Sequence, residues 1–227
     1  MGILKKLRGG KKKSKAVVDT TNWAATGAFQ RRPYATYEEY AEHQKSKLRL
    51  KRNKQTEADQ LFAAALADRL PAASKNLGGN NVLCLAARTG GECVAFVKLG
   101  YFVVGIDLNP GEANRHVVVG DFHNIQYADK SVDIVFTNSL DHAFDLDRIL
   151  REVRRVLKDG GRFIAEVVDP TVRGPGEFEA TWWSSINDVV AKIEEFGFTA
   201  QQRQTFDYPW VGTQIVFAKT PTASSAQ

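Results

Sequence analysis

Cysteine is scarce in this sequence, which holds only two cysteines among its 227 residues. Cys84 falls near the end of an expected strand and Cys93 in the helix expected after it, where thiols serve as small apolar groups. Small secreted scaffolds depend on many cysteines, whereas a chain of this length buries roughly 70% of its unfolded surface and folds without cross-links. The cysteine usage therefore argues against a disulfide framework and favours a reducing compartment.

Long apolar runs are also missing. The longest candidates, Leu61–Ala67 and Val82–Ala87, fall well short of the roughly 18 residues that a membrane-spanning helix requires. The first fifteen residues are basic but lack the apolar segment of a secretory signal. These absences predict a cytoplasmic protein without a transmembrane helix.

Acidic residues are absent from the N-terminal end. Residues 1–15 hold seven Lys or Arg and no Asp or Glu, although the whole chain has a net charge of only +5. Residues 55–227 carry a net charge of −6, which argues against specific nucleic-acid binding. Two hypotheses remain for residues 1–15. They contact an anionic membrane peripherally, where each basic residue contributes about 1 kcal/mol, or they form a tail that only solubilises the protein.

Composition and periodicity divide the chain into four parts. Residues 1–30 are expected to form a basic, disordered arm, because they lack periodicity and have few large apolar residues. Residues 31–72 are expected to form N-terminal helices, residues 73–220 the main domain and residues 221–227 a frayed tail.

The two N-terminal helices have different signals. Thr36 begins a capping box that opens a helix over residues 37–51, and Gln44 lies on the semi-polar side of this helix. A second, amphipathic helix begins at Thr56 and is expected to end before Pro71. For the first helix two interpretations remain open, a lid that folds over the ligand pocket and a solvated charged face.

From Asn81 onward, short apolar strands alternate with helices. This alternation is typical of an α/β protein whose parallel sheet is covered on both faces. Only eight residues, Leu108–Arg115, separate the second and third strands, so the third is expected to be a short edge strand. The last two strands are close enough in sequence for an antiparallel hairpin. We expect strands over residues 81–87, 102–108, 116–120, 132–138, 162–168, 198–208 and 213–219, and helices over residues 91–99, 145–157 and 182–196.

Polar residues follow the first four of these strands. In an open parallel sheet, ligands bind outside the carboxyl ends of the strands, near the point where the strand order reverses. Packing alone does not explain a row of polar residues at these places. The row consists of Arg88-Thr89-Gly90-Gly91-Glu92, Asp107-Leu108-Asn109-Pro110, Gly120-Asp121-Phe122-His123 and Asn138-Ser139-Leu140-Asp141-His142.

Four segments, in this order, resemble the class I S-adenosylmethionine-dependent methyltransferases of the methyltransferase type 11 kind. VLCLAARTGGE stands where the family has a loop similar to VLDLGCGTG, and GIDLNP follows with Asp107 at the family's acidic position. GDFHNIQYADKSVDIVFTNSLDHAFD and LREVRRVLKDGGRFI resemble the segments that carry the third, fourth and fifth strands. The resemblance implies methyl transfer from S-adenosylmethionine. It also implies a Rossmann-like, seven-stranded, mostly parallel sheet with a C-terminal antiparallel hairpin, preceded here by the N-terminal helices.

The resemblance and the strand ends together define the expected cofactor site. The loop at Thr89 and Gly90 suits the cofactor's carboxylate, because backbone N–H groups at a helix N-terminus bind anions. Asp107 is expected to accept hydrogen bonds from both ribose hydroxyls, and Asp121 one from the adenine amino group beside Phe122. Turn or cap roles remain alternatives for both aspartates. The complete expected set is Gln44, Ala86, Arg88, Thr89, Gly90, Glu92, Asp107, Leu108, Asp121, Phe122, His123, Asn138 and Ser139.

Three positions depart from the family's loop. Ala86 and Arg88 replace glycines, and Cys84 replaces a frequent acidic residue. These departures keep open a second hypothesis, a cofactor-binding module that has lost turnover. A third hypothesis, an NAD-dependent oxidoreductase, requires a tight G-x-G-x-x-G turn around a pyrophosphate, and this loop reads A-A-R-T-G-G. For a methyltransferase, the acceptor is expected to be a small molecule or a saccharide.

Candidate proton acceptors follow the fourth expected strand. Asp141 and His142 are expected beside the transferred methyl group, and histidine, with an ordinary pKa near 6.5, suits a base at neutral pH. His123 is the reserve candidate, and the alternative for His142 is a role that only shapes the pocket. Together with Asp121, these residues lack the spacing of a structural zinc site, so no metal is expected.

Overall fold

The computed structural model of the chain describes residues 21–49, 57–74, 79–112 and 114–221. The basic segment 1–15, Thr56 and residues 222–227 of the expected tail lie outside the described residues. Within the described ranges, no helix is long and apolar enough to cross a membrane.

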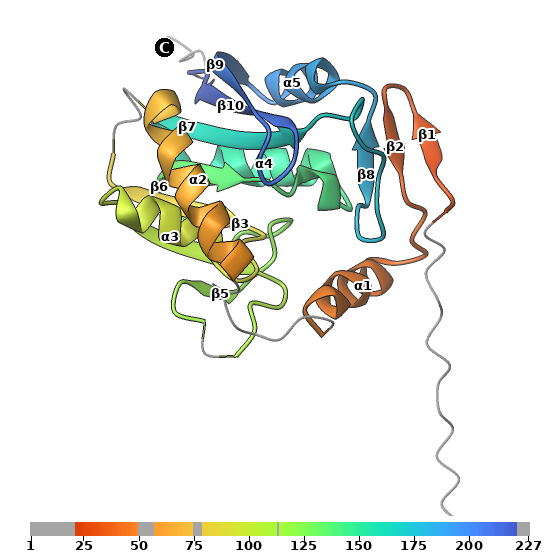
Figure 1. The fold of residues 1–227 in the computed structure, drawn as a ribbon. Helices are drawn as coiled ribbons and strands as arrows, with labels where there is room; N and C mark the ends of the chain where they lie inside the picture. The colour runs from red at the N-terminus through yellow and green to blue at the C-terminus, as the bar shows by residue number, and fades with distance from the viewer. Residues whose placement is uncertain (1–20, 50–56, 75–78, 113, 222–227) are drawn as a thin grey trace, which may run out of the picture.

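A seven-stranded sheet forms the centre of the molecule, in the order β5-β4-β3-β6-β7-β10-β9 (Figure 1). β10 is antiparallel to both of its neighbours, and the other pairs are parallel. β3 lies between β4 and β6, so the strand order reverses there. This sheet confirms the expected fold class. Its strands are β3 (Asn81–Leu85), β4 (Phe102–Asp107), β5 (Val117–Val119), β6 (Val132–Thr137), β7 (Leu157–Val168), β9 (Phe198–Phe206) and β10 (Gly212–Lys219).

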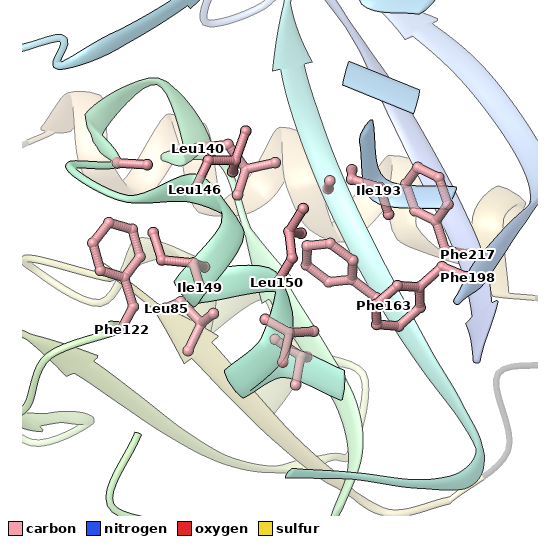
Figure 2. Packing of buried hydrophobic residues seen from close by; sticks show 14 of the residues in the cluster. Leu85, Phe122, Leu140, Leu146, Ile149, Leu150, Phe163, Ile193, Phe198 and Phe217 are labelled. Carbon is pink, nitrogen blue, oxygen red and sulfur yellow. The ribbon is translucent and has the colours of Figure 1, made fainter. Parts of the chain in front are cut away.

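Helices cover both faces of this sheet, and the alternation of side chains along β3 shows how. Val82 and Cys84 pack with residues of α2 (Glu57–Ser74) and α3 (Gly91–Lys98). Leu83 and Leu85 point to the opposite face. There they join residues of α4 (Leu146–Val156) and α5 (Ile186–Glu195) in a larger cluster, part of which Figure 2 shows. The central strands β3 and β6 are buried along most of their length, as expected for parallel strands that are covered on both faces.

The start and the end of α4 agree with the sequence, but the strand after it begins earlier than expected. Asp145 caps the helix by accepting a hydrogen bond from the backbone N–H of Arg148 at 3.0 Å. The helix ends at Val156, and β7 begins at Leu157 rather than at residue 162. The strand begins early because Leu157 pairs with Val132 of β6, ahead of a register shift in that ladder.

A second, three-stranded sheet corrects two expectations. β1 (Ala24–Thr26) and β2 (Phe29–Arg31) form a hairpin, so the expected disordered arm is wrong for these residues. β8 (Thr181–Trp183) pairs with β2, where a helix had been expected from residue 182. The aromatic residues of this segment are compatible with a strand, which pairing with β2 stabilises, and the helix begins only after its cap at Ser185, whose side chain accepts from the N–H of Asp188.

The N-terminal helices follow the sequence at their starts. α1 (Tyr37–Arg49) has the expected capping box, in which the Thr36 hydroxyl accepts from the Glu39 N–H at 3.2 Å. α2 does not end before Pro71 but continues to Ser74. Proline lacks the N–H donor of one helical hydrogen bond. Near the end of this long helix the loss of one bond is tolerated, and the residues up to Ser74 remain helical.

Candidate active site

A cavity of about 670 Å³ opens outside the carboxyl ends of β3, β4, β6 and β7, where the strand order reverses. Its size is typical of a small-molecule site. One part, which we call the floor, consists of lining residues in the ranges 86–92, 107–109, 120–122, 138–142 and 166–168. The other part, which we call the cover, consists of lining residues in the ranges 40–47, 58–62, 173–183 and 208–210.

Most of the expected site residues line this cavity. The exceptions are Gly90, Asp121 and His123, which lie outside the lining. The cavity brings together Gln44, Ala86, Arg88, Thr89, Glu92, Asp107, Leu108, Phe122, Asn138, Ser139, Asp141 and His142.

The loop after β3 keeps a tight, glycine-like shape although two glycines are replaced. Ala86 and Arg88 have φ angles of 53° and 38°, in the left-handed region that favours glycine, and Gly90 has a φ of 84°. The non-glycine residues pay about 1–3 kcal/mol each for such conformations. The Gly90 N–H donates to the Ala87 carbonyl at 2.6 Å and closes the turn. Ala86 and Arg88 therefore adopt the backbone conformations that glycine favours, although they replace glycines.

Asp107 ends β4 with both carboxylate oxygens already oriented. Its Oδ2 accepts a hydrogen bond from the Arg88 N–H at 3.0 Å, and its Oδ1 accepts from the Asn109 N–H at 2.7 Å. The second bond is the turn interaction that the sequence left open as an alternative. Each carboxylate oxygen has a second lone pair, so the turn role and binding of a ligand hydroxyl are compatible.

Asp121 and His123 form a structural pair behind the cavity. Asp121 Oδ1 accepts from the His123 backbone N–H at 2.8 Å and lies 2.9 Å from His123 Nδ1, and Tyr37 donates its hydroxyl to Oδ2 at 2.5 Å. His123 Nε2 accepts from the N–H groups of Phe144 and Asp145 at 3.2 and 3.1 Å. The His123 ring is only 1% exposed and both its nitrogens are engaged. His123 therefore does not line the cavity, and its roles as a cofactor ligand and as a reserve base stay predictions that require these bonds to be broken.

His142 faces the cavity with its tautomer fixed. Its Nδ1 donates to the carbonyl of Phe178 at 2.8 Å, because a carbonyl can only accept, which leaves a lone pair on Nε2. Lys47 of α1 lies 3.0 Å from this Nε2 and donates to it. Burial, together with the charge of Lys47, lowers the pKa of His142. The imidazole is neutral at pH 7, and its basic nitrogen is held by Lys47.

Asp141 lies beside His142 and is almost completely buried. Among the described residues its Oδ1 has no hydrogen-bond partner, and this atom lies 3.9 Å from His142 Nε2. Burial raises the pKa of this carboxyl. Arg173 lies 3.7 Å from Oδ2 and 3.1 Å from Glu179, so the acceptor end of the cavity mixes both signs of charge.

Two buried glutamates on the floor differ in their partners. Glu166 accepts from Arg69 Nε and Nη2 at 2.7 and 3.0 Å and from Gln214 Nε2 at 2.8 Å. Glu92 accepts from the neutral amide of Asn138 at 2.9 Å, and burial raises the pKa of Glu92 to about 7. The Arg69–Glu166 pair was missed in the sequence, because it joins segments about 100 residues apart.

Helix α1 is held over the cavity by hydrogen bonds from side chains to backbone carbonyls. Tyr40 donates its hydroxyl to the carbonyl of His142 at 2.9 Å, and Gln44 donates to the carbonyl of Phe178 at 2.7 Å. Asn109 in turn donates its side-chain amide to the carbonyl of Lys45 at 2.9 Å. These contacts position the helix over the cavity, as a lid requires, whereas opening of the lid remains a prediction.

Aromatic residues of the cover were not among the expected site residues. Phe62 of α2 stacks on Trp210, with ring centroids 6.1 Å apart, and both rings line the cavity with Trp183 and Tyr208. The sequence signal was present in the aromatic cluster near the terminal hairpin, but such clusters are more often core. Here Phe62, Trp183 and Trp210 both line the cavity and pack against the hydrophobic core.

Comparisons with known proteins agree with this geometry. The family model described as a methyltransferase domain matches residues 83–165. A Burkholderia thailandensis 1,6-didemethyltoxoflavin-N1-methyltransferase, solved with 1,6-didemethyltoxoflavin and S-adenosylhomocysteine, has a TM-score of 0.66 at 18% identity, over 87% of this chain and 98% of that one. The PH0226 protein of Pyrococcus horikoshii has a TM-score of 0.60 at 22% identity, over 78% of this chain and 99% of that one.

Curated relatives match over shorter stretches. Malonyl-[acyl-carrier protein] O-methyltransferase 1 of Coxiella burnetii is 36% identical over 72 residues, which is 30% of this chain and 26% of the relative. Demethylmenaquinone methyltransferase of Corynebacterium kroppenstedtii is 36% identical over 102 residues, which is 41% of this chain and 44% of the relative. The chain thus spans less than half the length of these relatives.

The fold of the chain is similar to that of solved S-adenosylmethionine-dependent methyltransferases, and its cavity lies where the strand order of the sheet reverses. Residues 83–165 match the family model of a methyltransferase domain, which confirms the resemblance found in the sequence.

Proposed function

We propose that the chain binds S-adenosylmethionine in this cavity and transfers the methyl group to a small-molecule or saccharide acceptor. One observation carries the proposal: the loop after β3, Asp107 and Asn138 meet around one cavity at the point where the strand order reverses. S-adenosylmethionine, when bound, supplies an electrophilic sulfonium methyl group. The chain has to bind the cofactor, align the acceptor and remove its proton.

The floor residues fit the parts of this cofactor. Asp107 presents two pre-oriented carboxylate oxygens to a pair of ribose hydroxyls. The N-terminus of α3, beside Arg88, suits a carboxylate. Phe122 and Leu108 line the cavity beside them and provide apolar surface for the adenine ring. The proposed adenine contact of Asp121 requires its carboxylate to accept one more bond beyond those from Tyr37 and His123.

Alignment is the main catalytic contribution that such a site can make. Holding a nucleophile in line with the methyl group removes roughly 7–11 kcal/mol of the barrier in well-oriented systems. The aromatic residues of the cover and the mixed charges of Asp141 and Arg173 surround the space left for an acceptor. This enclosure supports a small molecule as the acceptor.

His142 is the proposed base for an acceptor that loses a proton. Its Nε2 faces the cavity, and the bond from Nδ1 to Phe178 keeps the ring in the accepting tautomer. Lys47 must release Nε2 before His142 can accept a proton, and an acceptor oxygen that takes over the Lys47 hydrogen bond accomplishes this.

Calorimetry tests the proposal directly. The purified protein is titrated with S-adenosylmethionine, S-adenosylhomocysteine and NAD, and we expect binding of the first two. Binding of NAD alone overturns the proposal in favour of an oxidoreductase. Incubation with methyl-labelled cofactor and a fractionated metabolite extract then tests turnover, and cofactor binding without label transfer favours the hypothesis of a binding module.

A further inference from the structure

Glu92 is a buried acid that has no cationic partner in the part of the chain that the structure describes. Its side chain lines the cavity from the first turn of α3, and the residue is only 8% exposed. The neutral amide of Asn138 donates to Oε1, and among the described residues no Lys, Arg or His forms an ion pair with this carboxylate. Glu166, the other buried glutamate of the floor, is paired with Arg69. Of these two glutamates, it is therefore Glu92 that retains the cost of burying a carboxylate.

Cys84 does not provide a charge in its place. It stands at the position where the related loops have an acid, but its thiol is fully buried in the core beneath α2 and α3 and does not line the cavity. A cation entering this end of the cavity therefore meets Glu92 rather than a group from β3.

We infer that Glu92 binds the α-ammonium group of the methionine part of S-adenosylmethionine. The inference rests on the proposed function and assigns one contact within it. Glu92 lies in the first turn of α3, and the N-terminus of this helix suits the cofactor's carboxylate. An α-helix rises only about 1.5 Å per residue, so Glu92 is close to that N-terminus. The carboxylate and the ammonium are attached to one carbon atom, whereas the sulfonium is two methylene groups further along. The ammonium is thus the cation within reach.

The charges around Glu92 fit a zwitterion. Arg88, from the loop after β3, favours the ionised form of Glu92, whereas Glu166 of β7 and the burial of Glu92 favour the protonated form. Asn138 follows β6 and donates to the carboxylate. Arg88 and Glu92 thus supply one positive and one negative group at the same end of the cavity, as an amino-acid moiety requires.

A comparison of three ligands tests the assignment. Binding of S-adenosylmethionine, S-adenosylhomocysteine and 5′-methylthioadenosine, which lacks the amino-acid end, is measured by calorimetry for wild type and Glu92→Gln. We expect the variant to lose roughly 10- to 100-fold in affinity for the first two ligands, because a charge-assisted hydrogen bond is lost, and to bind 5′-methylthioadenosine unchanged. Glu195→Gln, at an exposed position at the end of α5, is the matched control and should bind all three normally.

The pattern of losses separates the alternatives. A loss confined to S-adenosylmethionine assigns Glu92 to the sulfonium and overturns the inference, as does an equal loss for all three ligands. If wild type binds S-adenosylhomocysteine and Glu92→Gln binds it equally well, the inference fails and the proposed function stands. If wild type binds none of the ligands, the proposed function itself fails.

A pH series adds a readout that simple loss of structure does not move. Wild-type affinity for S-adenosylhomocysteine should rise between pH 6 and 8, because Glu92 must be ionised to bind the ammonium. Glu92→Gln should show a flat profile over the same range, and thermal melting verifies that the variant is folded. Glu92→Asp, with a shorter reach, should regain the pH dependence with reduced affinity. Equal slopes for wild type and Glu92→Gln contradict the inference.

Discussion

The floor and the cover of the cavity are built in different ways. Floor residues stand at the ends of successive strands, so each is placed by the strand that precedes it. Cover residues come from α1, α2, the segment around β8 and the β9–β10 connection, and they meet only when the whole chain has folded. The floor is therefore a property of the sheet, whereas the cover depends on contacts between segments that are distant in sequence.

The difference extends to the interactions themselves. On the floor, Asp107 is oriented by backbone N–H groups from residues 88 and 109. The cover instead depends on side chains that are distant in sequence: Arg69 of α2 donates to Glu166 of the floor and also to the carbonyl of Tyr208, a cover residue, at 3.1 Å. We expect substitutions on the floor to act on ligand binding and chemistry, and substitutions that loosen the cover to act first on stability.

Removal of the proposed base should have the largest effect. His142→Ala should lower turnover by roughly 10²- to 10⁴-fold, the size of lost general-base assistance, with little change in cofactor affinity. His142→Asn serves as the structural control, since its amide can still donate to Phe178, and it should be equally slow. Initial rates with the acceptor found in the label screen measure both variants. Near-normal turnover in both leaves His142 with a pocket-shaping role.

Breaking the Arg69–Glu166 pair should have the largest effect on stability. Arg69→Met leaves Glu166 buried without its counter-ion and should lower the free energy of unfolding by about 3–5 kcal/mol. Urea denaturation measures this loss, and the double variant with Glu166→Gln should recover much of it. Lys130→Ala, which breaks an exposed pair with Asp159, should cost less than about 1 kcal/mol. Equal losses of stability in Arg69→Met and Lys130→Ala contradict the distinction between a buried and an exposed ion pair.

Glu92 should make the stability of the ligand-free protein pH-dependent. Its pKa is about 7 in the folded protein, against an ordinary value of 4.5. Between these values the unfolded chain loses a proton that the folded one keeps, so this group lowers stability as the pH rises. Relative to wild type, Glu92→Gln should gain up to roughly 3 kcal/mol between pH 4.5 and 8. Urea denaturation across this range measures the difference, and parallel curves contradict the prediction.

Asp107 tests the floor by ligand binding. Asp107→Ala should weaken binding of S-adenosylhomocysteine by about 1.5–3 kcal/mol, because a charge-assisted contact with the ribose is lost. Calorimetry measures the affinity, and a melting curve verifies the fold. Unchanged affinity in a folded variant assigns Asp107 to the turn with Asn109 alone.

Tyr40 should give the smallest of these effects. Tyr40→Phe removes the hydrogen bond to the carbonyl of His142 and should reduce the free energy of unfolding by about 1 kcal/mol. The ring remains, so its packing against Tyr34 and Phe144 is kept. A loss as large as that of Arg69→Met shows that α1 is as strongly coupled to the fold as α2 and contradicts the ranking.

The sequence predicted the floor well because its signals are local. An apolar strand followed by Asp107 or Asn138 places these residues at the edge of the sheet without knowledge of the rest of the chain. His123 shows the limit of such reasoning. It follows a strand like the others, but the N–H groups of Phe144 and Asp145, more than twenty residues away, saturate its ring.

The cover could not be predicted in the same way. The Arg69 side chain reaches Glu166, which also accepts from Gln214, only through the packing of α2 against the far end of the sheet. The β8 strand is similarly non-local, since it is defined by its pairing with β2, about 150 residues earlier. Taken alone, the aromatic pair Trp182 and Trp183 is compatible with either a helix or a strand. Pairing with β2 is what makes this segment a strand.

The contacts of α1 have a consequence for how such a site can evolve. Tyr40 and Gln44 bond to the carbonyls of residues 142 and 178, and Asn109 bonds to the carbonyl of Lys45. Backbone carbonyls are present whatever side chain the residue carries. Side chains at the acceptor end can therefore change over generations while the helix stays docked, so that a new acceptor preference can be explored without loss of the enclosed reaction space.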